Sequence, residues 1–143
     1  MVAPGVPSVV LVPATLRSIS VVRTAIRQAL ARNGWDEESI EHVVLAVSEA
    51  AANAIEHGSR PNELIEVVYQ IDPERASVRI LDEGRDRLWT PPTDHTLPAH
   101  HSDRGRGLYL IDHFADRFEI ITDGPGTELR LVFTPQSVAC DAA

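Results

Sequence analysis

The chain of 143 residues carries 13 basic and 21 acidic side chains, which gives a formal net charge of −8, and 43% of its residues are hydrophobic. This length predicts one domain, residues 1–143, with a core of its own, and the acidic balance argues against a surface for nucleic acid or for an anionic membrane. The single cysteine, Cys140, excludes a disulfide framework and a cysteine-based metal site, which fits a reducing compartment.

The N-terminus, MVAPGVPSVVLVPA, is apolar but lacks the basic start of a secretory signal. No apolar run reaches the roughly 20 residues that a membrane-spanning helix needs. We therefore expect a cytoplasmic protein with no membrane partner.

The first part of the chain predicts one strand and two helices. Residues 8–12, SVVLV, are mostly β-branched and bounded by prolines, as in a strand. Over residues 15–33 apolar side chains recur every three or four positions, which predicts a helix that Gly34 ends. A second helix is expected over residues 37–57, behind an N-terminal cap at Asp36.

Two β-rich stretches, 64–71 and 76–81, follow the helices. The segment DPER between them favours a tight turn, so we expect a hairpin. Residues 82–106 hold three prolines and three histidines without periodicity, and they predict a long irregular loop. A loop of this length in a compact domain is usually functional or disordered.

A short helix from Gly107, strands at 117–122 and 127–133, and a frayed tail at 134–143 complete the chain. The order β-α-α-β-β-loop-α-β-β predicts the α+β class. We expect a two-layer sandwich, in which helices cover one face of a mixed, mostly antiparallel sheet.

A polar row interrupts the alanine-rich end of the second helix. In SEAAANAIEHG, Glu49, Asn53 and His57 stand at every fourth position. Each step of four drifts by roughly 40°, so the row approaches the border of the apolar face. Glutamate can accept a proton, and asparagine offers a neutral oxygen to Mg²⁺. Spacing alone leaves open a solvated helix face.

Two glycine motifs follow. Asp82 ends a strand and Gly84 opens the loop, an arrangement that can receive a ligand's amino group but also suits an ordinary turn. Gly105 and Gly107 precede the third helix. Backbone N–H groups there suit phosphate, and a flexible hinge is the alternative.

Neighbouring side chains extend these motifs. Arg104 and Arg106 add positive charge, and Leu108 completes the string G-x-G-L. In GPGTEL the hydroxyl of Thr127 can serve a ligand, but threonine is also a good strand residue. The sequence contains neither a P-loop nor a Rossmann fingerprint.

The histidines of the loop do not predict a structural metal site. Among His95, His100 and His101 only the last two are adjacent, and neighbouring residues seldom chelate one ion together. The loop also contains no cysteine.

Taken in order, E-x-x-x-N-A-x-x-H, D-x-G, G-x-G-L and G-T resemble the GHKL family of ATPases, which includes gyrase-type topoisomerases, heat-shock chaperones and the ATP domains of sensor histidine kinases. The short length and the leading β-α-α order look most similar to the bacterial anti-sigma-factor serine kinases. The resemblance covers residues 8–133. It implies a Bergerat-type ATP-binding fold with an ATP lid at about 83–106.

The resemblance also implies residue roles. Glu49 matches the catalytic carboxylate that activates a substrate hydroxyl, and Asn53 matches the Mg²⁺ ligand. His57, one turn further, is grouped with the nucleotide-binding residues, and support of the helix end is the alternative. Asp82 matches the residue that binds the adenine amino group, and Gly84 the glycine near the base.

Thr127 matches the hydroxyl that joins Asp82 through water. The implied phosphate seat is the segment that carries the last two glycines: Arg104, Gly105, Arg106, Gly107 and Leu108. Two residues depart from the family pattern. Asp86 replaces a second glycine of the first glycine motif, and Glu56 stands where histidine kinases often have lysine.

The implied function is that of an ATP- and Mg²⁺-dependent protein serine/threonine kinase that binds a sigma factor and phosphorylates an anti-sigma-factor antagonist. One alternative is a non-catalytic nucleotide-binding switch that sequesters a transcription factor, which Asp86 favours. Another is a histidine-kinase-like domain that acts on a separate phosphotransfer protein. The family also implies a homodimer, to which Leu45 or the strand SVVLV can contribute apolar surface.

Overall fold

The structure is a computed structural model that describes residues 6–58, 63–82, 103–121 and 126–136, with side chains throughout except at 57–58 and 103–108. Its elements alternate in the expected order. They are β1 (Ser8–Pro13), α1 (Ser18–Arg32), α2 (Glu37–Asn53), the π-helical turn η1 (Ala54–Gly58), β2 (Leu64–Ile71), β3 (Ala76–Leu81), α3 (Asp103–Phe114), β4 (Arg117–Ile121) and β5 (Glu128–Phe133). None of the helices within the described ranges is long and apolar enough to cross a membrane.

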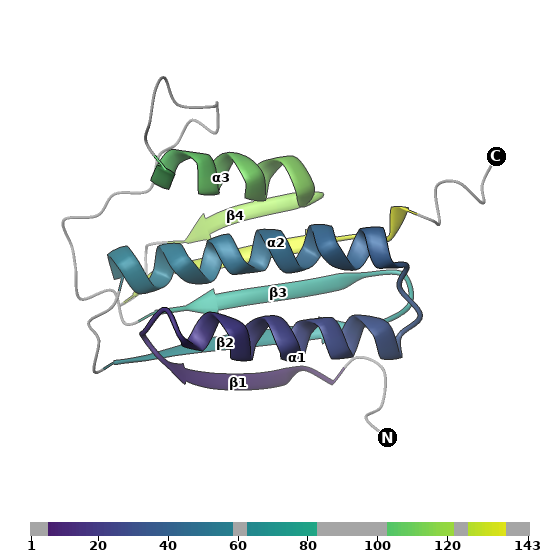
Figure 1. Cartoon of the computed structure of the whole chain (residues 1–143), viewed down its shortest axis with the longest axis horizontal. Helices are drawn as coiled ribbons and strands as arrows, with labels where there is room; N and C mark the ends of the chain where they lie inside the picture. Colours follow the sequence, from purple (N-terminus) through teal and green to yellow (C-terminus); the bar gives the residue numbers. More distant parts are fainter. Residues whose placement is uncertain (1–5, 59–62, 83–102, 122–125, 137–143) are drawn as a thin grey trace.

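The five strands form one sheet in the order β1-β2-β3-β5-β4, and every neighbouring pair is antiparallel. All three α-helices lie over the same face of this sheet (Figure 1). The α+β fold with helices on one face is therefore confirmed. The described sheet is wholly antiparallel, whereas the sequence predicted a mixed one.

Alternation along the strands separates the two faces of the sheet. On the helix-covered face the register aligns Val67, Ile80, Leu129 and Ile120 across four strands. The first three are at most 2% exposed. On the other face Arg79 and Arg130 stand opposite each other and are exposed. This period of two explains why the bounds of β2 and β3 agree with the sequence prediction.

Alanines let α2 lie close to the sheet. Ala46 and Ala50 are completely buried, and Ala54 just beyond the helix is 2% exposed. A side chain that ends at Cβ leaves the helix backbone near the strands, and such a tightly packed interface tolerates little added volume. The end of α2 is therefore held at a fixed height above β3 and β5.

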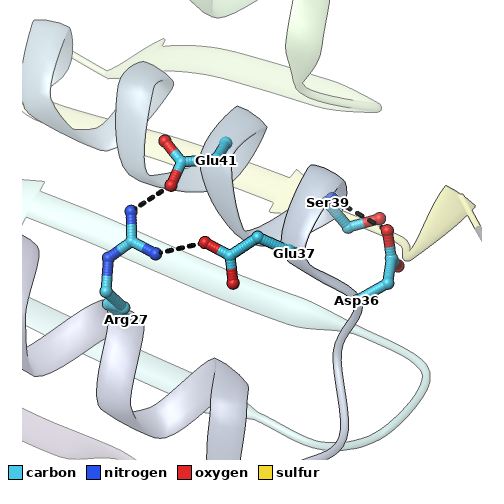
Figure 2. A network of polar contacts seen from close by, with 5 residues as sticks. All are labelled: Arg27, Asp36, Glu37, Ser39 and Glu41. Carbon is cyan, nitrogen blue, oxygen red and sulfur yellow. Dashed lines mark hydrogen bonds and ion pairs between the residues drawn. The ribbon is translucent and has the colours of Figure 1, made fainter.

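The contact between α1 and α2 has a charged rim (Figure 2). Arg27 of α1 donates hydrogen bonds to Glu37 at 2.9 Å and Glu41 at 2.5 Å, both on α2. Asp36 caps α2 as predicted, because its Oδ2 accepts from the backbone N–H of Ser39 at 3.0 Å. The hydrogen bond from Arg27 lowers the pKa of Glu41. Exposed ion pairs of this kind add little to stability.

Two further hydrogen bonds join distant segments at the end where α2 begins. The indole Nε1 of Trp35, which is 5% exposed, donates to the backbone oxygen of Asp72 in the β2–β3 turn at 2.9 Å. The backbone N–H of Gln136, after β5, donates to the hydroxyl of Ser39 at 2.9 Å. These bonds tie the start of α2 to the β2–β3 turn and to the segment that follows β5, which lie at the same end of the sheet.

Two boundaries of the first two helices differ from the prediction. The first helix begins at Ser18 and not near residue 15, because residues 15–17 form a turn in which the hydroxyl of Ser18 donates to the backbone oxygen of Pro13 at 2.6 Å. The second helix ends at Asn53 and not at His57, because the chain widens into the π-helical turn η1.

Replacing Ala50 by leucine is expected to lower the free energy of unfolding by about 1–3 kcal/mol, because the buried interface has no space for the added carbons. Urea denaturation followed by circular dichroism measures the change. The matched control is Ala31→Leu on the exposed side of α1, where a shift within about 0.5 kcal/mol is expected. Equal shifts for both variants would contradict the close packing of α2.

Candidate functional site

Glu49 and Asn53 lie one turn apart near the end of α2. Glu49 is half-buried and Asn53 is 5% exposed. The side-chain Nδ2 of Asn53 is buried without a hydrogen-bond partner in the structure. Buried polar atoms are normally paired, so this donor has a place for a partner, either a water molecule or a ligand. Rotating the carboxamide by half a turn would present its oxygen instead.

The pKa of Glu49 is raised, first by burial of the carboxyl group and second by the negative charge of Glu56. Burial disfavours the ionised form because the low-dielectric surroundings solvate charge poorly. A carboxylate with a raised pKa is a stronger base near neutral pH than an ordinary glutamate. The sequence correctly predicted that Glu49 lies on the second helix, but it did not indicate that the charge of Glu56 would raise the pKa of Glu49.

The π-helical turn η1 breaks the polar row after Asn53. A π-helix hydrogen-bonds from residue i to i+5, so four residues no longer make one turn, and such turns are frequent at functional sites. His57 belongs to η1, and its side chain lies outside the described part of the structure. The expected alignment of His57 with Glu49 and Asn53 therefore does not follow from helical spacing.

Asp82 and Thr127 meet where the β3–β5 ladder ends. The backbone N–H of Asp82 donates to the oxygen of Thr127 at 3.1 Å. The backbone N–H of Thr127 donates to Oδ1 of Asp82, also at 3.1 Å. Two motifs that are 45 residues apart in sequence are thus joined directly. The link from the Thr127 hydroxyl to Asp82 through water, which the resemblance implies, stays a prediction beside these two direct bonds.

The predicted motifs gather at one end of the molecule. In Figure 1 the end of α2, the end of β3, the beginning of β5 and the beginning of α3 all lie on the same side. This follows from the topology, because α2 and β3 run toward that end while β5 and α3 start from it. The residues that the motifs predict to take part in binding or catalysis therefore come from four separate elements.

The glycine segment of the third helix needs a correction. The sequence placed Gly105 and Gly107 before a helix, but α3 already begins at Asp103. The physical reason is that a helix tolerates glycines in its first turns when an acidic residue opens it near the positive end of its dipole. The segment 104–108 is thus part of the helix, and its side chains are not described.

Gly84, Asp86 and the three histidines of the loop lie outside the described residues. Within the described ranges no three His, Cys, Asp or Glu side chains group together as a metal cage would require. Mg²⁺ does not need such a cage, because it keeps several waters and is usually held by one or two protein oxygens together with phosphates. The carboxamide oxygen of Asn53 is a ligand of that kind, whereas its unpartnered Nδ2 can only donate a hydrogen bond.

A cavity of about 220 Å³ lies at the opposite end of the molecule, between the start of α2, the end of α3 and the end of β5. Its lining includes His42, Phe114 and Asp116. The rings of His42 and Phe114 stack at 4.5 Å. None of the residues that the sequence singled out for chemistry lines this cavity, so it does not belong to the candidate site.

Comparison with known proteins gives one family. The model of the histidine kinase-like ATPase domain matches residues 12–133. The serine-protein kinase RsbW of Bacillus cereus (strain AH187) is 27% identical over 120 residues, which are 78% of this chain and 75% of that protein. RsbW of Staphylococcus epidermidis is 26% identical over 118 residues, 76% of this chain and 74% of that protein.

Solved structures share the fold. The crystal structure of the RsbU and RsbW domains of a Mycobacterium tuberculosis protein superposes with a TM-score of 0.69 at 23% identity, and the match covers 93% of this chain and 33% of that one. The histidine kinase domain of an Erythrobacter litoralis blue-light-activated kinase gives a TM-score of 0.52 at 17% identity, covering 88% of this chain and 63% of that one. The chain therefore spans a third of the length of the Mycobacterium tuberculosis chain and less than two thirds of the length of the Erythrobacter litoralis chain.

Replacing Glu49 by glutamine is expected to stabilise the fold at neutral pH, because the neutral amide avoids the cost of an ionised carboxylate in this half-buried position. The folded chain holds the Glu49 proton more tightly than the unfolded chain. Wild-type stability therefore falls as the pH rises from the ordinary value of 4.5 through the raised pKa. Urea unfolding at successive pH values should show the two proteins diverging over this window.

Glu41→Gln is the matched control with the opposite sign. Because Arg27 lowers the pKa of the exposed Glu41, this variant should lose only a little stability at neutral pH, and the difference should vanish as the carboxyl group is protonated in acid. A Glu49→Gln variant that loses stability in the same way would contradict the raised pKa of Glu49.

Proposed function

The chain belongs to the histidine kinase-like ATPase domain family, and on that premise we propose that it is an ATP- and Mg²⁺-dependent protein serine/threonine kinase. The observation that carries the proposal is the pair on α2: a half-buried glutamate of raised pKa, one turn from a buried asparagine with an orphaned amide. The bacterial relatives named serine-protein kinase RsbW support the choice of hydroxyl substrates.

Glu49 is the proposed catalytic residue. It would accept the proton of a substrate serine or threonine hydroxyl as the oxygen of that hydroxyl attacks the γ-phosphorus of ATP and the bond from phosphorus to the ADP oxygen breaks. Phosphoryl transfer depends mainly on positioning and charge neutralisation, so one well-placed carboxylate can suffice on the protein side. Its raised pKa brings the basicity of Glu49 closer to neutral pH.

Asn53 is the proposed Mg²⁺ ligand. Bound Mg²⁺ would supply positive charge to the phosphate oxygens and hold them in place. Asn53 is 5% exposed, so packing restricts its side chain, and a half-turn of the carboxamide alone would bring its oxygen to bear one turn beyond Glu49. A ligand on a rigid helix positions a cation better than a ligand on a loop.

Asp82 is the proposed contact of the adenine amino group. A carboxylate has about four lone-pair sites, so it can accept from the backbone N–H of Thr127 and from a ligand at the same time. The bond from Thr127 fixes the orientation of the carboxylate. Gly84, His57 and the hydroxyl of Thr127 keep the nucleotide-binding roles that the resemblance implies.

The beginning of α3 is the proposed phosphate seat. Unpaired backbone N–H groups at a helix N-terminus favour anions, and Arg104 and Arg106 belong to the first turns of this helix. The predicted ATP lid, about 83–106, stays a prediction, and its residues 83–102 lie outside the described ranges. The whole chain, 1–143, stays one predicted domain.

The proposed partners are a sigma factor, an anti-sigma-factor antagonist that carries the substrate hydroxyl, and a second copy of this chain, all in the cytoplasm. The second candidate function is a non-catalytic nucleotide switch that sequesters a transcription factor. The specific observation in its favour is Asp86, because a side chain where the family has its second glycine alters the backbone freedom beside the nucleotide.

Glu49→Gln is expected to keep ATP binding and to lose phosphoryl transfer by about 10²–10⁴-fold, since only the proton acceptor is removed. Calorimetry with ATP and Mg²⁺ measures binding. Transfer is measured with γ-labelled ATP on proteins that the chain captures from the native cytoplasm, followed by phospho-amino-acid analysis. Glu41→Gln, on the exposed side of α2, should leave both unchanged. ATP binding without transfer in wild type would contradict the kinase and favour the switch.

Asp82→Asn is expected to weaken ATP binding by about 1.5–3 kcal/mol, roughly ten- to hundredfold in Kd, because a charge-assisted hydrogen bond to the adenine amino group is lost. The fold should persist, since the asparagine oxygen can still accept from Thr127. The control is Asp72→Asn in the β2–β3 turn, where the aspartate also accepts backbone N–H groups. Equal affinities of the wild type and Asp82→Asn would remove Asp82 from the site.

A further inference from the structure

The cavity beside the start of α2 combines aromatic walls with one carboxylate. The rings of His42 and Phe114, which stack at 4.5 Å, and the buried ring of Phe133 contribute to its lining. The carboxylate of Asp116 also lines the cavity, and its Oδ2 accepts from the hydroxyl of Thr134 at 2.7 Å. Aromatic rings attract a cation that lies over their faces, and the carboxylate attracts it as well.

The end of α3 adds negative potential to the same cavity. The helix ends at Phe114, and Asp116 follows two residues later. The last carbonyl groups of a helix lack partners within the helix and carry the negative end of its dipole, which favours a cation nearby. A cation held by Asp116 therefore lies beside a helix terminus of the matching sign.

The described part of the chain supplies no cation to this cavity. Among the described residues no arginine lines it, and the sequence contains no lysine. Arg117, which follows Asp116, pairs with Val132 on the helix-free face of the sheet, whereas Phe133 lines the cavity from the covered face. The residues after Gln136, SVACDAA, contain no basic side chain either. A cation for Asp116 therefore has to come from outside.

The start of α2 does not turn the cavity into an anion site. The backbone N–H of Ser39 already donates to Oδ2 of Asp36 (Figure 2). The hydroxyl of Ser39, which lines the cavity, accepts from the backbone N–H of Gln136. Asp36 and the acidic residues Glu37 and Glu38 of the first turn offset the positive end of the α2 dipole. The cavity therefore favours a cation over an anion.

The volume limits the ligand to a group about as large as one side chain. At about 220 Å³ the cavity is smaller than the roughly 300–1,000 Å³ of pockets that enclose drug-sized ligands. A guanidinium group suits such a site better than an ammonium group does. It is planar, stacks on aromatic rings, presents paired donors to a carboxylate and is more weakly hydrated.

We propose that this cavity binds the guanidinium group of a small organic cation, which is either a free alkylguanidine or an arginine side chain of a partner protein. Asp116 accepts its N–H groups, and the rings of His42 and Phe114 form the aromatic wall. The site lies at the opposite end of the molecule from Glu49 and Asn53, so it goes beyond the proposed kinase function and does not depend on it. The excess of acidic over basic residues, 21 against 13, draws cations toward the chain.

Titration followed by two-dimensional ¹H–¹⁵N NMR tests the site on the full chain. The ligands are butylguanidinium, N-acetyl-arginine N-methylamide and butylammonium, at about pH 7.5, where most histidine side chains are neutral. Both guanidinium compounds should shift the amide signals of Phe114, Asp116 and Gln136, and butylammonium should bind more weakly. Tighter binding of the blocked arginine than of butylguanidinium assigns the site to a side chain of a partner protein, and the reverse assigns it to a free cation.

Asp116→Lys is expected to lower the affinity for butylguanidinium by about tenfold or more, because the variant replaces the carboxylate with a cation of its own. Asp112→Lys is the matched control. It makes the same change in net charge one turn earlier on α3, outside the lining, and should lower the affinity by about twofold or less in 0.15 M salt, where exposed charges are screened within about 8 Å. Both aspartates are exposed, so both variants should keep the wild-type circular dichroism spectrum.

Three results would overturn the site. The first is equal loss of affinity in Asp112→Lys and Asp116→Lys, because that loss would reflect general attraction to an acidic protein. The second is the absence of shifts at Phe114, Asp116 and Gln136 with either guanidinium compound. The third is binding of butylammonium as tight as that of butylguanidinium, which would contradict the choice of a planar cation.

Discussion

The packing of α2 against the sheet is the constraint on which the rest of the molecule depends. Ala46 and Ala50 allow the helix to lie close to the strands, and this fixes the height of everything that α2 carries. Asn53 is drawn into the buried layer with them, while Glu49 stays at its border. A larger side chain in this layer would lift the end of the helix away from β3 and β5, whose ends supply Asp82 and Thr127.

The sequence predicts the elements whose pattern is local and periodic. Alternation defines β2 and β3 to the residue, and Asp36 marks the start of α2 because its cap is a contact within one turn. The end of α2 was missed, since residues 54–57 have ordinary helical propensities and nothing in their order signals a π-helical turn. The start of α3 was missed because two glycines usually argue against a helix.

For the candidate site, too, the local motifs could be predicted from the sequence, whereas their arrangement in space could not. The motifs could be read from the sequence as a set, and the resemblance placed Glu49, Asn53, Asp82 and Thr127 in one family pattern. Their joining depends on strand order, which pairs segments far apart in the chain and has no local signature. The coupling of Glu49 to Glu56 is likewise a property of the folded charge distribution, because a like charge and burial act together only after α2 has packed.

The cross-links at the start of α2 have a consequence for how the fold opens. Trp35 with Asp72 and Ser39 with Gln136 fasten that end of the molecule across 37 and 97 residues of chain. At the other end the elements that meet carry a half-buried carboxylate and an unpaired amide. Local unfolding starts where buried polar groups are stabilised by the fewest hydrogen bonds and contacts. Among the described residues, amide hydrogens at the end of α2 should therefore exchange faster than those beside Trp35.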